Sequence, residues 1–433
     1  MFNPVPSNKC CKERGFFIDK WSEYGYIGLG LETDYLVKQV ENPDKRHLMK
    51  KQQVALVTGD GSGPEMMDQA ARIVVRAARR DDIEIEFVDT PMGWNAFKQF
   101  NDTTPAESMR KALGIGLIFF GGVGDPAMDS TIGKAHPEMM PEARALLKIR
   151  KDLGLLLNFR PMRLIPSLAH LSPLRPELIP AGGVDMHFIR CLLEDSYFGT
   201  SDLRMHIDGD TRQKLGIKLK SEVVGDEEMV TELAYYRRET IQQYFRAAFT
   251  YARKLGLPLI SVDKNNVMPR YAFWRKIVEE IAKEFPDVPC RHQLVDSANM
   301  LLFKPAQLQG VVACGNEHGD ILSDGAAEMV GGMGLMHSSA VNPETGQAMF
   351  ESGAGTAPTL AGQDKANPLG RILTGAMLLR HIGAENGALA IEMAVGRVLQ
   401  TGYRTADIAE PGCIPGKILG CSEMGQVVFQ EIL

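Results

Sequence analysis

Several features are scarce or missing in the 433-residue sequence, and each absence excludes a class of protein. The seven cysteines show no C-x-x-C or C-x-H spacing, so neither a zinc site nor a disulfide framework is predicted. No apolar run approaches the roughly 18 residues that a membrane-spanning helix needs. The N-terminus has no apolar core followed by a small-residue cleavage site, so no secretory signal is predicted.

Charge of one sign is not concentrated anywhere in the chain. The sequence carries 48 basic and 54 acidic residues, with a net charge of -6, and has no strongly basic block. Proteins that bind nucleic acid non-specifically rely on such blocks to neutralise phosphates. We therefore expect a cytoplasmic protein with reduced cysteines and with neither nucleic acid nor a membrane as a partner.

Apolar strands alternate with helices over most of the chain. The segment QQVALVTGDGSGPE predicts a strand, a glycine turn and a helix that continues through MMDQAARIVVRAARR. IEIEFVD, GIGLIFFGG and LPLISVD predict further strands, and ILTGAMLLRHIG and ENGALAIEMAVGRVLQ predict helices near the C-terminus. This alternation is typical of an α/β fold with a largely parallel sheet covered by helices.

The glycine loop GDGSGP at residues 59–64 follows a strand and precedes a helix, which is the position of a dinucleotide-binding loop. The full G-x-G-x-x-G spacing is missing, and Asp89 ends the next strand later than that fingerprint requires. A tight turn between strand and helix explains the glycines equally well.

Three acidic residues near the middle of the chain suggest a metal site. Asp320 and Asp324 in GDILSDGA are one helical turn apart, so on a helix their carboxylates share a face. With Asp296 in LVDSANM they form an oxygen-only set, which suits Mg²⁺ or Mn²⁺. Lys264 in VDKNNV follows an apolar run, at a predicted strand end. Alone, an Asp-x-x-x-Asp pair is more typical of a solvated helix face.

Taken together, the motifs resemble those of the β-decarboxylating dehydrogenases, the isocitrate/isopropylmalate dehydrogenase family. VALVTGDGSGPEMM, FFGGVGDP, LNFRPMRL, VDKNNV, GDILSD and AGQDKANP occur in the order typical of that family, from about residue 52 to the C-terminus. The resemblance implies a two-domain fold with a largely parallel central sheet flanked by helices, which is not a Rossmann fold. Residues 53–155 plus 331–433 would form a large cofactor-binding domain, and residues 156–330 a small domain with the metal site and the dimer interface.

The resemblance also assigns the site residue by residue. Three arginines would grip the carboxylates of a malate-type substrate, because guanidinium groups bind carboxylates bidentately. Tyr197 and Lys264 match the catalytic pair, and the three aspartates match the metal ligands. In the family, the equivalents of Lys264 and Asp296 come from the neighbouring subunit, so a homodimer with shared active sites is expected. The three arginines are Arg150, Arg160 and Arg190.

The reaction that this resemblance implies is metal-dependent oxidative decarboxylation of a 3-substituted malate, with hydride transfer to NAD(P). Lys264 would assist removal of the hydroxyl proton, and Tyr197 would protonate C3 after CO₂ is lost. The alternative is a non-catalytic regulatory subunit of a hetero-oligomeric dehydrogenase. Such subunits lose catalytic residues, whereas this sequence keeps the family's residue type at each of these positions.

The cofactor segment departs most from the family pattern. Ala354 replaces the histidine that usually precedes the GTAP motif, and Thr359 and Leu360 provide no cation for a 2′-phosphate. Asp407 falls roughly where an NADP-dependent enzyme has arginine. The sequence therefore favours NAD over NADP. The predicted cofactor-binding residues are Asn266, Gly355, Thr356, Ala357, Thr359, Leu360 and Asn367.

The C3 substituent of the substrate is left open between two chemistries. Leu146 and Leu147 lie one turn before Arg150, where isopropylmalate dehydrogenases meet an apolar group. Arg144 would make an anionic substituent possible if it pointed inward, and otherwise it faces solvent. Residues 1–52 are predicted to be an extension of unknown role: an oligomer contact, a tail, or sequence upstream of a true start at Met49.

Overall fold

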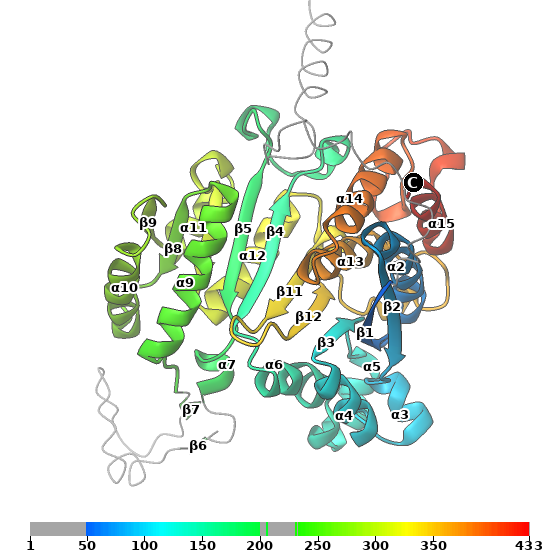
Figure 1. The fold of residues 1–433 in the computed structure, drawn as a ribbon, viewed down its shortest axis with the longest axis horizontal. Coiled ribbons are helices and arrows are strands. Elements are labelled where there is room, and N and C mark those ends of the chain that lie inside the picture. The colour runs from blue at the N-terminus through cyan, green and yellow to red at the C-terminus, as the bar shows by residue number, and fades with distance from the viewer. Residues whose placement is uncertain (1–48, 200–204, 207–229, 232, 433) are drawn as a thin grey trace, which may run out of the picture. The chain divides into compact units, whose positions relative to one another are not determined.

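The computed structural model describes residues 49–199, 205–206, 230–231 and 233–432, so the predicted extension lies almost wholly outside the described part. A ten-stranded sheet runs through this part in the order β2-β1-β3-β12-β11-β4-β5-β10-β8-β9. A separate two-stranded sheet pairs β6 (Met205–His206) with β7 (Val230–Thr231) (Figure 1). The ten strands are β1 (Lys50–Val57), β2 (Ile83–Asp89), β3 (Leu117–Phe120), β4 (Leu157–Arg163), β5 (Asp185–Cys191), β8 (Leu259–Asp263), β9 (Cys290–Leu294), β10 (Gly310–Cys314), β11 (His337–Val341) and β12 (Ala348–Ser352).

The large sheet is largely parallel, which confirms the predicted fold class. Parallel pairs join β2, β1, β3 and β12 on one side of the sheet, and β5, β10, β8 and β9 on the other. The strands between these two sets, β11 and β4, pair antiparallel with their neighbours. The α-helices within the described residues are α2 (Gly63–Ala78), α3 (Trp94–Phe100), α4 (Ala106–Ile115), α5 (Pro126–Met128), α6 (Lys148–Asp152), α7 (Ser196–Gly199), α9 (Arg238–Leu255), α10 (Pro269–Ala282), α11 (Val295–Leu301), α12 (Asn316–Met329), α13 (Leu369–His381), α14 (Glu385–Gln400) and α15 (Cys421–Glu431).

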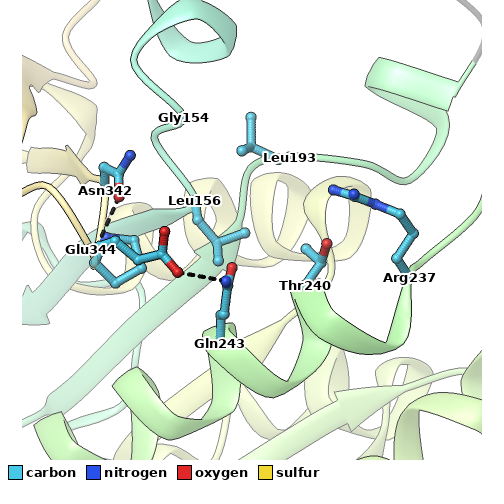
Figure 2. A pocket seen from close by; sticks show the side chains of 9 residues that line it. Gly154, Leu156, Leu193, Arg237, Thr240, Gln243, Asn342 and Glu344 are labelled. Carbon is cyan, nitrogen blue, oxygen red and sulfur yellow. Dashed lines mark hydrogen bonds between the residues drawn. The ribbon is translucent and has the colours of Figure 1, made fainter.

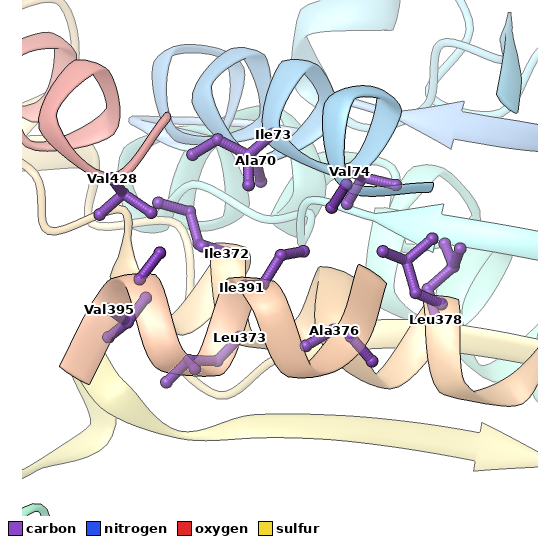
Figure 3. Close-up of a cluster of buried hydrophobic side chains, with 14 of the residues drawn as sticks. Ala70, Ile73, Val74, Ile372, Leu373, Ala376, Leu378, Ile391, Val395 and Val428 are labelled. Carbon is purple, nitrogen blue, oxygen red and sulfur yellow. The ribbon is translucent and has the colours of Figure 1, made fainter. Parts of the chain in front are cut away.

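Helix α2 shows how local sequence determines an element. It begins directly after the glycine loop, with Pro64 in its first turn and Glu65 near its N-terminus, both of which favour a helix start. Ile73, Val74 and Ala77 recur at helical spacing and are fully buried. They pack with α13, α14 and α15 into the largest apolar cluster (Figure 3).

In the other half of the sheet, alternate residues of each strand face two separate cores. Val311 and Ala313 of β10 pack toward α9 and α10, whereas Val312 and Cys314 pack toward α11 and α12. This is the period of two that a strand buried on both faces requires. The same alternation decides which polar side chains of β4 and β5 face α12.

The predicted domain segments correspond to two groups of neighbouring strands. Strands from residues 53–155 and 331–433 lie together on one side of the sheet, and strands from 156–330 lie together on the other. Because one continuous sheet contains both groups of strands, the division into two domains stays a prediction. Within the described ranges, no helix is long and apolar enough to cross a membrane.

Candidate active site

Two buried arginines project from neighbouring strands toward α12. In the antiparallel pairing of β4 with β5, Asn158 lies opposite Arg190 and Arg160 lies opposite Phe188. Phe188 packs in the core beneath α12, so Arg190, two residues further along β5, has its side chain on that same face. Arg160 shares this face, and its Nε donates to Asn158 Oδ1 at 2.8 Å.

Helix α12 presents Asp320 and Asp324 to these arginines, as their spacing predicts. Arg190 makes a close ion pair with Asp320. Arg160 bridges the two carboxylates, with Nη2 3.1 Å from Asp320 Oδ1 and Nη1 3.0 Å from Asp324 Oδ1. Gly319 makes this approach possible, because a Cβ there would lie 3.0 Å from both Cβ and Cγ of Arg190. Helix α12 therefore packs directly on the Arg190 side chain at a position that has no side chain of its own.

Burial shifts the ionisation of this cluster. Removal from water, with the nearby charge of Arg160, lowers the pKa of Arg190 to about 10. Burial also raises the pKa of Asp324, against the opposing effect of the Arg160 charge. The cluster thus holds charged groups whose pKa values are shifted mainly by burial, as in sites for charged ligands.

Arg150 joins the cluster from α6. Its Nη2 lies 3.3 Å from Glu351 Oε2 on β12, and its pKa is lowered by burial. The segment before α6, Glu142–Leu147, is π-helical, which is a rare form associated with functional sites. This segment carries Leu146 and Leu147, both half-buried.

Arg144, on the same π-helical segment, is bound to Asp102. Its Nη1 lies 2.6 Å from Asp102 Oδ1 and 3.3 Å from Thr103 Oγ1. The guanidinium is therefore paired with Asp102 instead of being free in solvent, and it does not point toward the cluster that Arg150 joins. Its role in recognising an anionic substituent stays a hypothesis, now with a competing partner for its charge.

Tyr197, in α7, also contacts the arginine and aspartate cluster. Its hydroxyl donates to Asp320 Oδ2 at 3.1 Å, and its ring lies 5.1 Å from the Arg190 guanidinium carbon. Partial burial and the charge of Asp320 raise the pKa of the Tyr197 phenol. The phenol is consequently protonated at neutral pH, as a proton donor has to be.

Lys264 and Asp296 form a separate pair. Lys264 follows β8, at the strand end where it was expected, and makes a close ion pair with Asp296 of α11. No hydrogen bond or ion pair joins either residue to Asp320 or Asp324 within the described residues, nor do three potential metal ligands gather there. The predicted three-carboxylate metal site therefore stays a prediction that needs a second copy of the chain.

The predicted cofactor loop lies against the glycine loop of residues 59–64. Ser62 donates from its backbone N and its Oγ to Thr356 O, at 2.8 and 3.0 Å. Ala357 has a φ of 38°, which is rare for a residue with a side chain. The buried Arg371 donates to Gly355 O at 2.8 Å and to Phe120 O at 3.2 Å. Contacts from distant segments thus fix this loop.

The other predicted cofactor residues surround this loop or lie near Lys264. Asn367 donates to Asp407 Oδ2 at 3.0 Å, which places an acidic group beside it. Thr359 is exposed, and Leu360 packs beside Met66 and Ala366. Asn266 is exposed in the turn after Lys264.

Sequence reasoning missed the role of Asp60 in the glycine loop. Its buried carboxylate accepts from the backbone N of Trp94 at 2.9 Å, Asn95 at 2.7 Å and Gly124 at 2.8 Å. These bonds tie three loops at the end of the sheet together, so the loop functions here as a structural junction. The sequence signal that could have indicated this role is the single acidic residue between two glycines. Arg371 gave no signal, because its partners are far away in the sequence.

A small surface pocket of about 190 Å³ lies apart from these residues (Figure 2). It is lined by Leu193, Arg237, Thr240, Gln243 and Glu344, among others, and by none of the predicted site residues. We therefore assign the candidate site to the arginine and aspartate cluster.

Known proteins resemble this chain over most of its length. A family model described as isocitrate/isopropylmalate dehydrogenase matches residues 53–428. The 3-isopropylmalate dehydrogenase of Chromobacterium violaceum is 38% identical over 376 residues, covering 87% of this chain and 98% of that protein. That of Moorella thermoacetica is 37% identical over 381 residues, covering 88% and 98%. The solved isocitrate dehydrogenase from Methylococcus capsulatus superposes with a TM-score of 0.70 at 25% identity, covering 88% of this chain and 99% of that one.

Proposed function

Because the chain belongs to the isocitrate/isopropylmalate dehydrogenase family, whose members are decarboxylating dehydrogenases, we propose that it oxidises and decarboxylates 3-isopropylmalate with NAD and Mg²⁺ or Mn²⁺. The observation that carries the proposal is the cluster in which Arg160 and Arg190 meet Asp320 and Asp324, with Tyr197 in contact. Relatives named 3-isopropylmalate dehydrogenase support the choice of substrate.

The charges of the cluster match a dicarboxylate bound together with a divalent cation. Three guanidiniums, of Arg150, Arg160 and Arg190, face three carboxylates, of Asp320, Asp324 and Glu351. A substrate with two negative charges and a cation with two positive charges add no net charge to this balanced set. Oxygen donors alone suit Mg²⁺ or Mn²⁺, so Asp320 and Asp324 fit such a cation, with Asp296 of a second copy as the third ligand.

The geometry around Arg150 favours an apolar C3 substituent. Leu146 and Leu147 lie one helical turn from Arg150, and Leu146 packs against the neighbouring apolar core. Arg144 is paired with Asp102. The described segment Glu142–Leu147 therefore offers no unpaired cation to an anionic substituent near the leucines. This supports isopropylmalate over isocitrate.

In the proposed reaction, the three arginines hold the two substrate carboxylates and orient C2 and C3. A cation held by Asp320 and Asp324 would supply polarisation of the C2 hydroxyl, and bound NAD would supply the acceptor for the hydride from C2. Lys264 of the second copy takes the hydroxyl proton, so C2 becomes a carbonyl. The bond from C3 to its carboxylate then breaks, CO₂ leaves, and its electron pair forms an enolate. Tyr197 donates its phenolic proton to C3 of this enolate.

For the cofactor, we propose NAD, bound by the loop from Gly355 to Leu360 together with Asn266 and Asn367. The carboxylate of Asp407, 3.0 Å from Asn367 Nδ2, supports NAD because it would repel a 2′-phosphate near that amide. Thr359 is exposed and carries no charge to attract such a phosphate.

We also propose that the site is shared across a homodimer. Large apolar side chains are exposed close in sequence to the proposed site residues: Val267 at 55%, Met300 at 62%, Phe303 at 54% and Ile321 at 65%. Such a group, beside the Lys264 and Asp296 pair, suits a self-complementary interface.

The test is an assay of the purified chain alone for NADH formation. We expect turnover with 3-isopropylmalate, NAD and Mn²⁺, loss of activity with a chelator, and much weaker rates with isocitrate or with NADP. Absence of NADH formation under all these conditions would contradict the proposal and favour the regulatory-subunit alternative.

A further inference from the structure

The turn that leads into Tyr197 contains two residues in an unfavourable backbone conformation. Glu194 has a φ of 84° and Asp195 a φ of 65°, in the region that favours glycine. A residue with a side chain is strained in this region and persists there only where its surroundings hold it. Both side chains are buried, so the conformation is held from inside the protein.

Glu194 fixes the turn to the start of α9. Its carboxylate accepts from the backbone N of Arg237 at 2.8 Å, from Arg237 Nε at 2.5 Å and from Thr240 Oγ1 at 2.7 Å. Figure 2 shows Arg237 and Thr240 at this end of the helix, beside Leu193. A carboxylate at a helix N-terminus is also favoured by the helix dipole.

Asp195 fixes the same turn to the start of α12. Its Oδ2 accepts from the Tyr236 hydroxyl at 2.7 Å and from the backbone N of Glu317 at 3.3 Å. The Tyr236 hydroxyl in turn accepts from the backbone N of Asn316 at 3.1 Å. Asp195 and Tyr236 together thus cap the helix that carries Asp320 and Asp324.

Gly315 shows how closely this cap and α12 are packed. A Cβ at Gly315 would lie 2.3 Å from Tyr236 Oη, 3.0 Å from Tyr271 Oη and 3.3 Å from Asp195 Oδ2. Arg270 Nη2 is 3.5 Å from Asp195 Oδ1 and provides the opposite charge. The position of Asp195 relative to α12 is therefore closely defined.

Tyr197 follows this turn by two residues and is exposed to solvent, at 43%. Its described contacts at the site are the bond to Asp320 and the approach to Arg190. We propose that Asp195 is a positioning residue, which locks the turn to α12 and thereby sets the reach of Tyr197 toward the substrate. This inference rests on the proposed function, in which Tyr197 donates the proton to C3.

Substitutions at position 195 separate backbone strain from the cap. Asp195→Gly relieves the unfavourable φ but removes the carboxylate, and we expect kcat to fall about 100-fold with little change in KM. Asp195→Asn keeps an oxygen acceptor and tolerates the left-handed region, so it should retain most of kcat. Tyr236→Phe removes the hydroxyl that joins Asp195 to the backbone N of Asn316 but keeps the Asp195 carboxylate, and its kcat should also fall.

A double-mutant cycle with Tyr197→Phe distinguishes positioning from a merely structural role. If Asp195 acts through Tyr197, Asp195→Gly and Tyr236→Phe lower kcat no further in the Tyr197→Phe background. Losses that multiply would overturn the inference, as would wild-type kcat in Asp195→Gly or equal losses in Asp195→Gly and Asp195→Asn. Should Asp195→Gly fail to fold, Tyr236→Phe takes its place. Its loss of kcat should exceed that of Asp195→Asn and should disappear in the Tyr197→Phe background, and any other result would overturn the inference.

The matched control is Asp82→Gly, which relieves a φ of 53° at the end of a helical turn far from Tyr197 in the sequence, and should leave kcat unchanged. The unaltered chain is assayed first with 3-isopropylmalate, NAD and Mn²⁺. No turnover there would overturn the proposed function and this inference together. Normal turnover with an unaffected Asp195→Gly variant would overturn this inference alone.

Discussion

At the residue scale, the ion pair between Arg144 and Asp102 bears directly on substrate choice. Because the Arg144 guanidinium is held 2.6 Å from Asp102, we expect Arg144→Ala to leave the proposed preference for 3-isopropylmalate over isocitrate unchanged. The measurement is kcat/KM for both substrates in the variant and the unaltered enzyme. A selective change for isocitrate would show instead that Arg144 faces the C3 substituent.

Leu147→Ala is the companion substitution on the same segment. Removing apolar contact from an isopropyl group should lower kcat/KM for 3-isopropylmalate by about 10- to 100-fold, because a few methylene groups in an apolar pocket are worth that much. D-malate, which lacks the substituent, should be affected far less. Equal losses for both substrates would place Leu147 outside the substituent pocket.

Asp185 allows a prediction about acid stability. Burial alone would raise its pKa, but the hydrogen bond to His187 and the charge of Arg163 outweigh burial and lower the pKa to about 2. The unfolded value is about 3.9, so this stabilisation is complete above about pH 5 and is lost as the pH falls toward 2.

Asp185→Asn should therefore lower the free energy of unfolding at pH 6, and the difference from the unaltered protein should shrink between pH 4 and pH 3. Urea unfolding at these pH values measures it. The exposed Asp68 gives a control, since Asp68→Asn should cause little change at any of them. A difference for Asp185→Asn that stays constant with pH would contradict the assignment.

At the element scale, the closeness of α12 to β5 depends on Gly319. An alanine would favour the helix by about 1 kcal/mol, yet its Cβ would lie 3.0 Å from Arg190 Cβ. We expect Gly319→Ala to move α12 and to weaken Mn²⁺ binding about tenfold, because substitution of residues that orient metal ligands typically lowers metal affinity by that much or more. Gly325→Ala on the same helix meets only the flexible Leu302 Cδ1, at 3.2 Å, and is the control.

Titration of Mn²⁺ against activity and binding measures the effect in both variants. Equal affinity in Gly319→Ala and the unaltered enzyme would mean that the helix accommodates the methyl group without moving Asp320 and Asp324.

The elements that the sequence predicted are those with a strong local pattern. IEIEFVD alternates and is β2, the run LPLISVD ends in β8, and the C-terminal apolar patterns are α13 and α14. The antiparallel strands β4 and β11 were not predicted, because their partners are distant: Ser339 pairs with Phe159. Periodicity within a window carries no information about such pairs.

The site residues were predicted through the family resemblance, and the structure adds how they are held. Arg160, Arg190, Asp320, Asp324 and Tyr197 come together in one chain. The supports behind them were not predicted. Two acidic residues in a glycine-favouring conformation carry no sequence signal, and the partners of Asp195 lie 41 and 122 residues away.

At the scale of the whole molecule, the proposed sharing of active sites between two copies predicts complementation between inactive variants. Lys264→Met and Asp320→Asn should each be inactive as homodimers. After unfolding and refolding as an equal mixture, half of the dimers are mixed, and each mixed dimer has one intact site of two. Activity should therefore return to about one quarter of the unaltered level. No recovery in mixtures that contain mixed dimers would contradict a shared site.

The order of the strands also bears on how the chain folds during synthesis. Strands β4, β5, β8, β9 and β10 come from residues 157–314 and lie side by side, so they can pair as soon as this stretch has been made. Strand β3 ends at Phe120 but pairs with β12, which begins at Ala348. One edge of β3 must therefore stay unpaired until β12, in the last fifth of the chain, has been made. A ribosome-bound chain stopped before residue 348 should have the later-made half of the sheet folded and the earlier-made half incomplete.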